Sequence, residues 1–199
     1  MNLNIFTSFV IGGLFLLTLL AFNSFVFNSA VETTTGVMTE NSFDTIVEIL
    51  ENDINRLGYN TGTADNIMTM TEVTFEFKGD IYDEDGIGTV ANYNTVEWHL
   101  TSNKATSTDN PDDYTLTRTF DPDPFFSGDS EELTFNVTHL EFKYLDANGS
   151  ETNDPKLVKQ ISIELVHESK NSYHVSTKGA EKYYRSVWNR TIVPNNLTF

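Results

Sequence analysis

The sequence predicts an α+β fold, in which a long N-terminal helix packs against a head of antiparallel β-sheet. Three observations lead to this prediction. No charged side chain precedes Glu32, an apolar stripe with helical spacing follows it, and much of the remaining chain alternates apolar and polar residues. These patterns divide the chain into a transmembrane half-helix (1–31), an amphipathic half-helix (32–59) and a β-rich globular head (60–199).

The first segment is apolar enough to cross a bilayer. It runs from Ile5 to Val31 without a charge or a proline, and about 20 apolar residues are enough to span the hydrocarbon core as one helix. A cleavable signal peptide is the alternative, because 28–30 (NSA) is an acceptable cleavage site. Such peptides have a cationic start and an apolar run of roughly 7–15 residues. We therefore expect a retained, single-pass anchor.

The second segment continues as a helix with one apolar face. Gly36, which follows three threonines, is the expected position of a break or kink. Gly58 comes one residue after the stripe ends, where a helix C-cap is expected. An apolar stripe needs a partner, and the head is the simplest one. The residues expected to pack on the head are Phe43, Ile46, Val47, Leu50, Ile54 and Leu57.

The head shows the two-residue period of β-strands. The alternating segments are 73–77, 96–100, 133–137, 140–144 and 161–165. Alternation of this kind predicts an antiparallel sheet with one packed face and one solvated face. Because 133–137 and 140–144 alternate in opposite phases, we expect a bulge or bend near Thr138 and His139.

Composition excludes several function classes. The net charge is −17, with 29 acidic and 12 basic residues, which argues against a nucleic-acid partner. The chain has no cysteine, and this excludes disulfides, thiol catalysis and cysteine-ligated metals. No nucleophile elbow, phosphate-binding loop or paired-histidine metal motif occurs. We therefore expect a protein that is not an enzyme and has no cofactor.

One acidic turn is a candidate calcium site. Asp80, Asp83 and Asp85 place three carboxylates close together, and Gly86 follows them. Calcium binds six to eight oxygen ligands, which acidic loops can provide. The spacing differs from that of an EF-hand loop, so we expect a solvated hairpin turn that needs no metal to fold, with a bound calcium ion as the alternative.

Three stretches of the chain have the features of a known family. They are the helix end 49–59 (ILENDINRLGY), the strand and turn 141–149 (EFKYLDANG) with the strand 159–165 (KQISIEL), and the closing segments 185–188 (RSVW) and 194–197 (PNNL). In this order the chain resembles type IV pilin-like proteins, in particular minor pilins and pseudopilins of the PilW and PulJ type.

The resemblance implies a structural subunit of a type IV pilus or a type II secretion-type filament. It implies a single-pass protein of the inner membrane, with its head in the periplasm or on an extracellular filament. Its partners would be membrane lipid, other pilin-like subunits and an inner-membrane assembly platform. Small residues let membrane helices approach closely, so Ser8, Gly12 and Gly13 would form the helix–helix contact.

The leader differs from the family pattern. Pilin precursors have a basic leader and a glutamate four residues after the first mature phenylalanine. Here nothing basic precedes Phe9, and Gly13 stands in the place of the glutamate, so cleavage by a prepilin peptidase is not implied. A subunit of this kind suits the filament tip or the initiation complex. The alternative function is a membrane-tethered β-sandwich module that binds a glycan or a protein.

Overall fold

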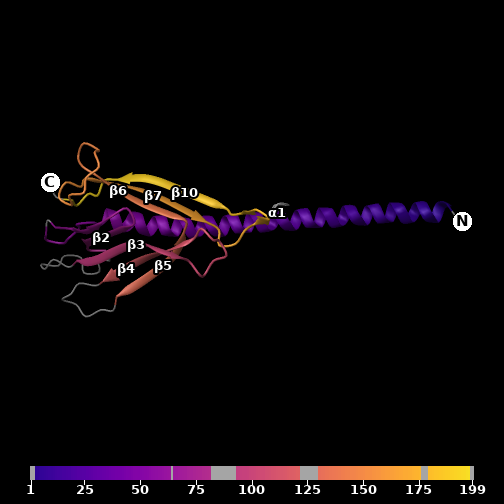
Figure 1. Ribbon diagram of the computed structural model, residues 1–199, viewed down its shortest axis with the longest axis horizontal. Helices are drawn as coiled ribbons and strands as arrows, with labels where there is room; N and C mark the ends of the chain where they lie inside the picture. The colour runs from indigo at the N-terminus through magenta and orange to yellow at the C-terminus, as the bar shows by residue number, and fades with distance from the viewer. Residues whose placement is uncertain (1–2, 64, 82–92, 122–129, 176–178, 198–199) are drawn as a thin grey trace.

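The computed structural model describes residues 3–63, 65–81, 93–121, 130–175 and 179–197 (Figure 1). Its dominant element is α1 (Leu3–Asn55), a single helix of 53 residues. The helix is about 80 Å long, given a rise of about 1.5 Å per residue. Figure 1 shows its N-terminal half projecting from the head and its C-terminal half running between two groups of strands. The predicted α+β class is confirmed.

The expected break or kink at Gly36 is wrong. The helix passes through this position without interruption, and the ring of Tyr184 packs against it. A Cβ added to Gly36 would lie 3.0 Å from the Tyr184 ring. A glycine inside a helix costs only about 1 kcal/mol relative to alanine. The close approach of an aromatic ring therefore explains the glycine without a bend.

The described strands form two main antiparallel sheets and a small hairpin. The five-stranded sheet has the order β1-β2-β3-β4-β5, and the three-stranded sheet has the order β10-β7-β6. The first sheet contains β1 (Ile67–Met70), β2 (Thr74–Gly79), β3 (Asn94–Lys104), β4 (Tyr114–Asp121) and β5 (Glu131–Val137). The second contains β6 (His139–Leu145), β7 (Gln160–Glu168) and β10 (Arg185–Ile192), and the hairpin pairs β8 (His174–Val175) with β9 (Glu181–Lys182).

The chain passes from one sheet to the other at Thr138. Val137 ends β5 and His139 begins β6, and these strands belong to different sheets. The Thr138 N–H donates to the carbonyl oxygen of Val166 on β7, at 3.0 Å. The change of alternation phase in the sequence thus marks a bend between two sheets.

The apolar stripe of α1 lies inside the core. Leu50 and Ile54 are fully buried, as is Leu57 just after the helix, while Val47 is only partly buried. Both main sheets contribute to the same core, and their largest buried side chains are Phe75, Phe77, Trp98, Leu116, Leu140, Phe142, Ile161 and Ile163. The head is therefore built around the second half of α1, and the other two stripe residues, Phe43 and Ile46, are buried with it.

Candidate functional site

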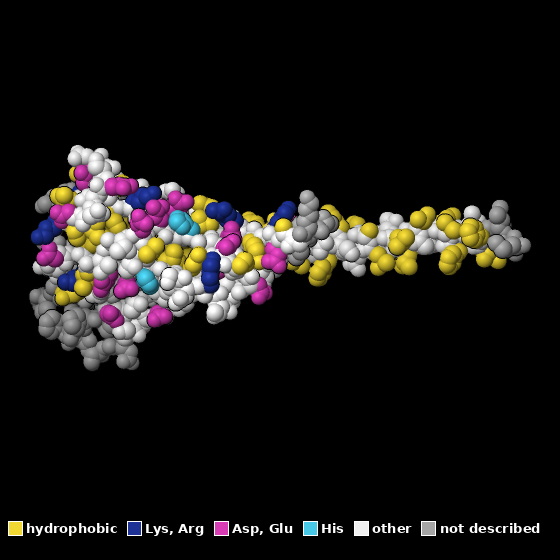
Figure 2. Space-filling model, viewed as in Figure 1, with side chains coloured by type: hydrophobic (Ala, Val, Ile, Leu, Met, Phe, Trp, Pro, Cys, Tyr) yellow, Lys and Arg dark blue, Asp and Glu magenta, His cyan; other side chains and the backbone are white. Residues whose placement is uncertain are grey.

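The projecting half of α1 is an exposed apolar surface. From Ile5 onward the helix is long and apolar enough to cross a membrane, and none of its most apolar stretch is buried in the head. Figure 2 shows apolar side chains along the projecting helix and charged side chains on the head. Phe9, for example, is 80% exposed. Such a surface requires lipid or another protein to cover it.

The three small residues predicted to form a helix–helix contact lie on this projecting half. Ser8, Gly12 and Gly13 are all exposed. Apart from the chain neighbours and the surrounding helix backbone, no described atom lies within 4 Å of a Cβ added to either glycine. Ser8 and Gly12 are four residues apart and therefore share one side of the helix. Their role in helix association stays a prediction.

A buried ion pair fastens α1 to the first sheet, and the sequence analysis did not anticipate it. Asp53 Oδ2 accepts hydrogen bonds from Arg118 Nε at 2.7 Å and from Trp98 Nε1 at 2.9 Å. Arg118 Nη2 donates to Asp53 Oδ1 at 2.9 Å. Burial raises the pKa of the Asp53 carboxyl, and the hydrogen bonds and charge of Arg118 oppose that rise.

The pattern of the sequence contained a clue to this pair. Arg118 stands between Leu116 and Phe120 in the apolar phase of its strand, and Asp53 lies within the apolar stripe of its helix. Two opposite charges on faces that must be buried are expected to meet, because an unpaired buried charge is very unfavourable.

The candidate calcium residues are only partly described. Asp80 is almost buried, and its Oδ2 accepts a hydrogen bond from Asn60 Nδ2 at 2.9 Å. Its carbonyl oxygen accepts from Arg56 Nη1 at 3.1 Å. Asp83 and Asp85 lie outside the described residues. The metal-free turn therefore stays a prediction, with calcium binding as its alternative.

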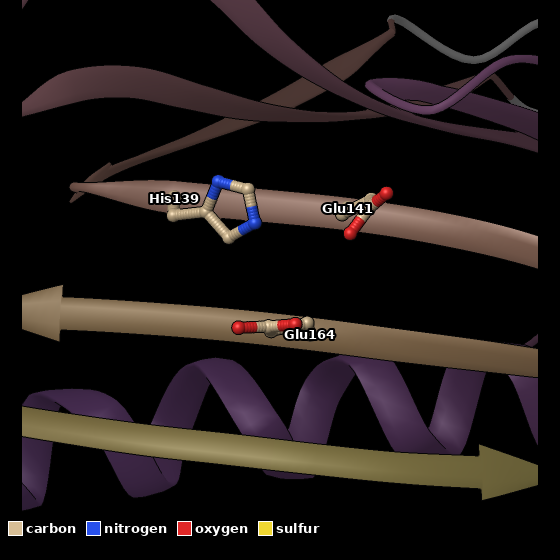
Figure 3. A group of neighbouring side chains, drawn as sticks. All are labelled: His139, Glu141 and Glu164. Carbon is tan, nitrogen blue, oxygen red and sulfur yellow. The ribbon is translucent and has the colours of Figure 1, made fainter.

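The structure brings together one group of possible metal ligands that are separated in the sequence. His139 and Glu141 on β6 lie beside Glu164 on β7, with ligand atoms within 4.8 Å of one another (Figure 3). Glu141 already pairs with the Lys143 ammonium, at 3.2 Å between Nζ and Oε2. Because His139 is exposed and a lysine neutralises one carboxylate, the group has the features of a solvated strand surface.

A groove lies between α1 and β5, one of the two edge strands of the first sheet. The groove has a volume of about 400 Å³, with Ile46 and Phe135 among its apolar lining and Lys170 among its polar lining. His167 also lines it, and the His167 ring stacks on Phe43 with 6.3 Å between centroids. The groove is one of several hollows of similar volume on the described surface, and it has an edge strand along one side.

Comparison with known proteins does not name a family. The sequence matches no protein-family model, and no curated protein matches it.

Proposed function

We propose that this chain is a pilin-like assembly subunit of the inner membrane, which associates with other subunits through the projecting half of α1. In this proposal it is a minor pilin or pseudopilin of a type IV pilus or a type II secretion-type filament. Its head lies in the periplasm or on the extracellular filament. The proposal rests on one observation, the uninterrupted course of α1 from an exposed apolar half into the core of the head.

The rigid connection supports assembly over simple anchoring. A tether needs only an apolar segment, and a flexible linker after it would serve equally well. Here the helix that leaves the apolar region also carries the core residues Leu50 and Ile54. The position of the helix therefore fixes the position of the head, as required of a subunit packed at a defined place in an assembly.

Close packing, and not the hydrophobic effect, drives helix association in lipid. The exposed side with Ser8 and Gly12 suits such packing because neither side chain keeps a neighbouring helix away. The absence of a glutamate at Gly13 suits a position at the filament tip or in the initiation complex. There the subunit need not offer a charge partner inside the apolar filament core.

The experiment replaces small residues on one side of the helix. Gly12→Leu with Gly13→Leu keeps the segment apolar, so membrane insertion should be unchanged. Co-purification with other pilin-like subunits should fall at least about fivefold, which corresponds to roughly 1 kcal/mol. Thr18→Leu with Ala21→Leu is the matched control, because Ala21 lies on the side of the helix opposite Gly12. This control should retain its partners.

A membrane-tethered binding module is the second candidate function, and the groove beside β5 favours it. The two candidates differ in what the projecting helix must do. Exchange of residues 5–31 for an unrelated polyleucine segment abolishes assembly if the helix packs against specific partners. Full assembly with the polyleucine segment would contradict the pilin-like proposal and favour the tethered module.

A further inference from the structure

One edge of β5 lies beside the groove and has no strand paired to it in the described part of the chain. β5 is the last strand of its sheet, with β4 on one side only. The carbonyl oxygen of Asn136 accepts a hydrogen bond from His167 Nδ1 at 2.8 Å. Two residues further on, the Thr138 N–H donates a hydrogen bond to the carbonyl oxygen of Val166. Both therefore point away from β4. Main-chain groups two residues apart point the same way in a strand, so those of Thr134 also point away from β4.

The same alternation places the N–H and C=O of Glu132 on this free edge. Among the described residues, no main-chain hydrogen bond from another element reaches Glu132 or Thr134 on that side. Among the described residues, two donors and two acceptors of β5 thus lack a main-chain partner on this edge, and Thr134 lines the groove itself. An open edge of this kind is a template for pairing with another strand.

The apolar face of β5 is incompletely covered beside this edge. Leu133, Phe135 and Val137 share the core-facing phase of the strand. Val137 is fully buried, yet Leu133 is 42% exposed. At its Val137 end, β5 lies against β7. Toward Leu133, the described elements cover the apolar face of β5 less completely than they do at Val137. The uncovered apolar area lies where an added strand would place its inward-facing side chains.

Charge distinguishes the two ends of this edge. Lys170 is the only charged residue among the described residues that line the groove. Within the described part of the chain, no carboxylate lies within ion-pair distance of its ammonium group. Glu131 and Glu132 are exposed at the opposite end of β5. A complementary segment would carry a carboxylate near Lys170 and no negative charge near the two glutamates.

We propose that the groove between α1 and β5 binds an extended segment of another protein, which adds to β5 as a strand and places a carboxylate beside Lys170. This goes beyond assembly through the projecting half of α1, since it concerns a different surface and a different kind of contact. Strand addition gives affinity through main-chain hydrogen bonds and selectivity through alternate side chains.

A second copy of this chain does not fit as the occupant through self-pairing of β5. Antiparallel pairing of two β5 strands requires a two-fold axis perpendicular to the strands. Figure 1 shows β5 running obliquely along the length of the molecule. Such an axis would turn the two projecting helices in different directions. Two copies anchored in one bilayer therefore cannot form this pair.

β5 runs from Glu131 to Val137, so an antiparallel added strand places its N-terminus near Lys170 and its C-terminus near the two glutamates. The test uses the full-length protein in detergent micelles and a fluorescent probe peptide, acetyl-Asp-Asp-Thr-Val-Thr-Val-Thr-Val. A second probe begins with Lys-Lys in place of Asp-Asp. Fluorescence anisotropy should show the acidic probe binding at least about tenfold more tightly than the basic one, a difference of about 1.4 kcal/mol. Lys170→Glu should reverse this preference, because it reverses the charge at the end of the groove.

A matched pair of variants at Thr134 tests the main-chain contact. Thr134→Pro removes an N–H that points away from β4, so it takes no donor from the β4–β5 ladder. It should weaken binding of the acidic probe at least about tenfold, whereas Thr134→Ala, which keeps the N–H, should stay within about twofold. Hydrogen exchange on the wild-type protein adds a readout without any substitution. Saturating probe should protect the amides of Glu132 and Thr134.

Four results would overturn the proposal. One is unprotected Glu132 and Thr134 amides at saturating probe, and another is wild-type affinity in Thr134→Pro. A third is displacement of the probe by free glutamate alone, which would mean that the groove takes a small anion. The fourth is absence of binding by either probe. Since all measurements use single subunits in micelles, failure here is separate from failure of helix-mediated assembly.

Discussion

Asp53 on α1 and Arg118 on β4 form a bidentate ion pair inside the head, although they are 65 residues apart in the sequence. Both side chains are almost completely buried. The indole N–H of Trp98 on β3 completes the set of donors to Asp53. Apolar packing alone tolerates small rotations of a helix about its axis. A bidentate pair of hydrogen bonds does not, because both bonds depend on the orientation of the two side chains. The pair therefore fixes the rotation of α1 relative to the first sheet.

Removing one member of this pair should be more harmful than removing both. Arg118→Met leaves the Asp53 carboxylate buried with Trp98 as its remaining donor, and the free energy of unfolding should fall by about 3–5 kcal/mol. Asp53→Leu with Arg118→Met leaves no buried charge at this contact and should lose less stability than the sum of the single variants. Urea unfolding followed by tryptophan fluorescence measures these differences. Additive losses would mean that the two side chains act independently.

Asp113, just before β4, should make stability depend on pH. It is fully buried, and neither carboxylate oxygen has a hydrogen-bond partner among the described residues. Burial raises the pKa of the Asp113 carboxyl above its usual value, although the nearby Thr108 hydroxyl lowers it, and the charge of Glu168 raises it as well. The folded state thus holds this proton more tightly than the unfolded state. The resulting stabilisation is complete below the unfolded pKa of about 3.9 and is lost as the pH rises through the folded value.

Asp113→Asn removes this ionisation while nearly preserving the shape of the side chain. At pH 7 the variant should be about 1–3 kcal/mol more stable than the wild type, because an amide carries no charge that must be desolvated without a partner. The gain should shrink at pH 4, and urea unfolding at both pH values measures it. Asp112→Asn is the control, because the Asp112 side chain is 78% exposed. An equal gain at the two pH values would contradict the assignment to ionisation.

Two glycines with similar backbone angles should respond differently to alanine. Gly58 has φ of 74° and Gly149 has φ of 79°, both in the left-handed region. A Cβ at Gly58 would lie 2.7 Å from the carbonyl oxygen of Asn196, whereas no described atom lies within 4 Å of one at Gly149. Gly149→Ala should cost about 1 kcal/mol through backbone strain alone. Gly58→Ala should cost more, as measured by thermal unfolding, and equal costs would mean that the chain near Asn196 moves aside freely.

The sequence predicted those parts of the fold that follow from periodicity. The spacing of Phe43, Ile46, Leu50 and Ile54 identified the buried side of α1, because residues three or four apart lie on the same side of a helix. The change of phase between β5 and β6 likewise located the bend at Thr138. The local composition around Gly36 did not reveal its role, since the ring that packs there belongs to Tyr184, far away in the chain.

The candidate sites were harder to predict from the sequence, because they too depend on contacts between residues far apart in the chain. The groove depends on which strand is outermost in the first sheet, and strand order is a long-range property that alternation does not contain. The group of His139, Glu141 and Glu164 similarly depends on the register between β6 and β7. Asp53 and Arg118 each interrupt an apolar pattern in the sequence. Their contact could have been predicted by pairing these two charged residues of opposite sign.

The contact between Tyr184 and Gly36 has a mechanical consequence. The Tyr184 ring fills the position where a hinge was expected, so α1 runs as one continuous helix from its exposed apolar half into the head. The part of α1 beyond Val31 is about 36 Å long. With the apolar half in a bilayer, a tilt of about 20° would carry the far end of this part sideways by about 12 Å. Bilayer thickness and helix tilt would thereby set which side of the head faces a neighbouring molecule.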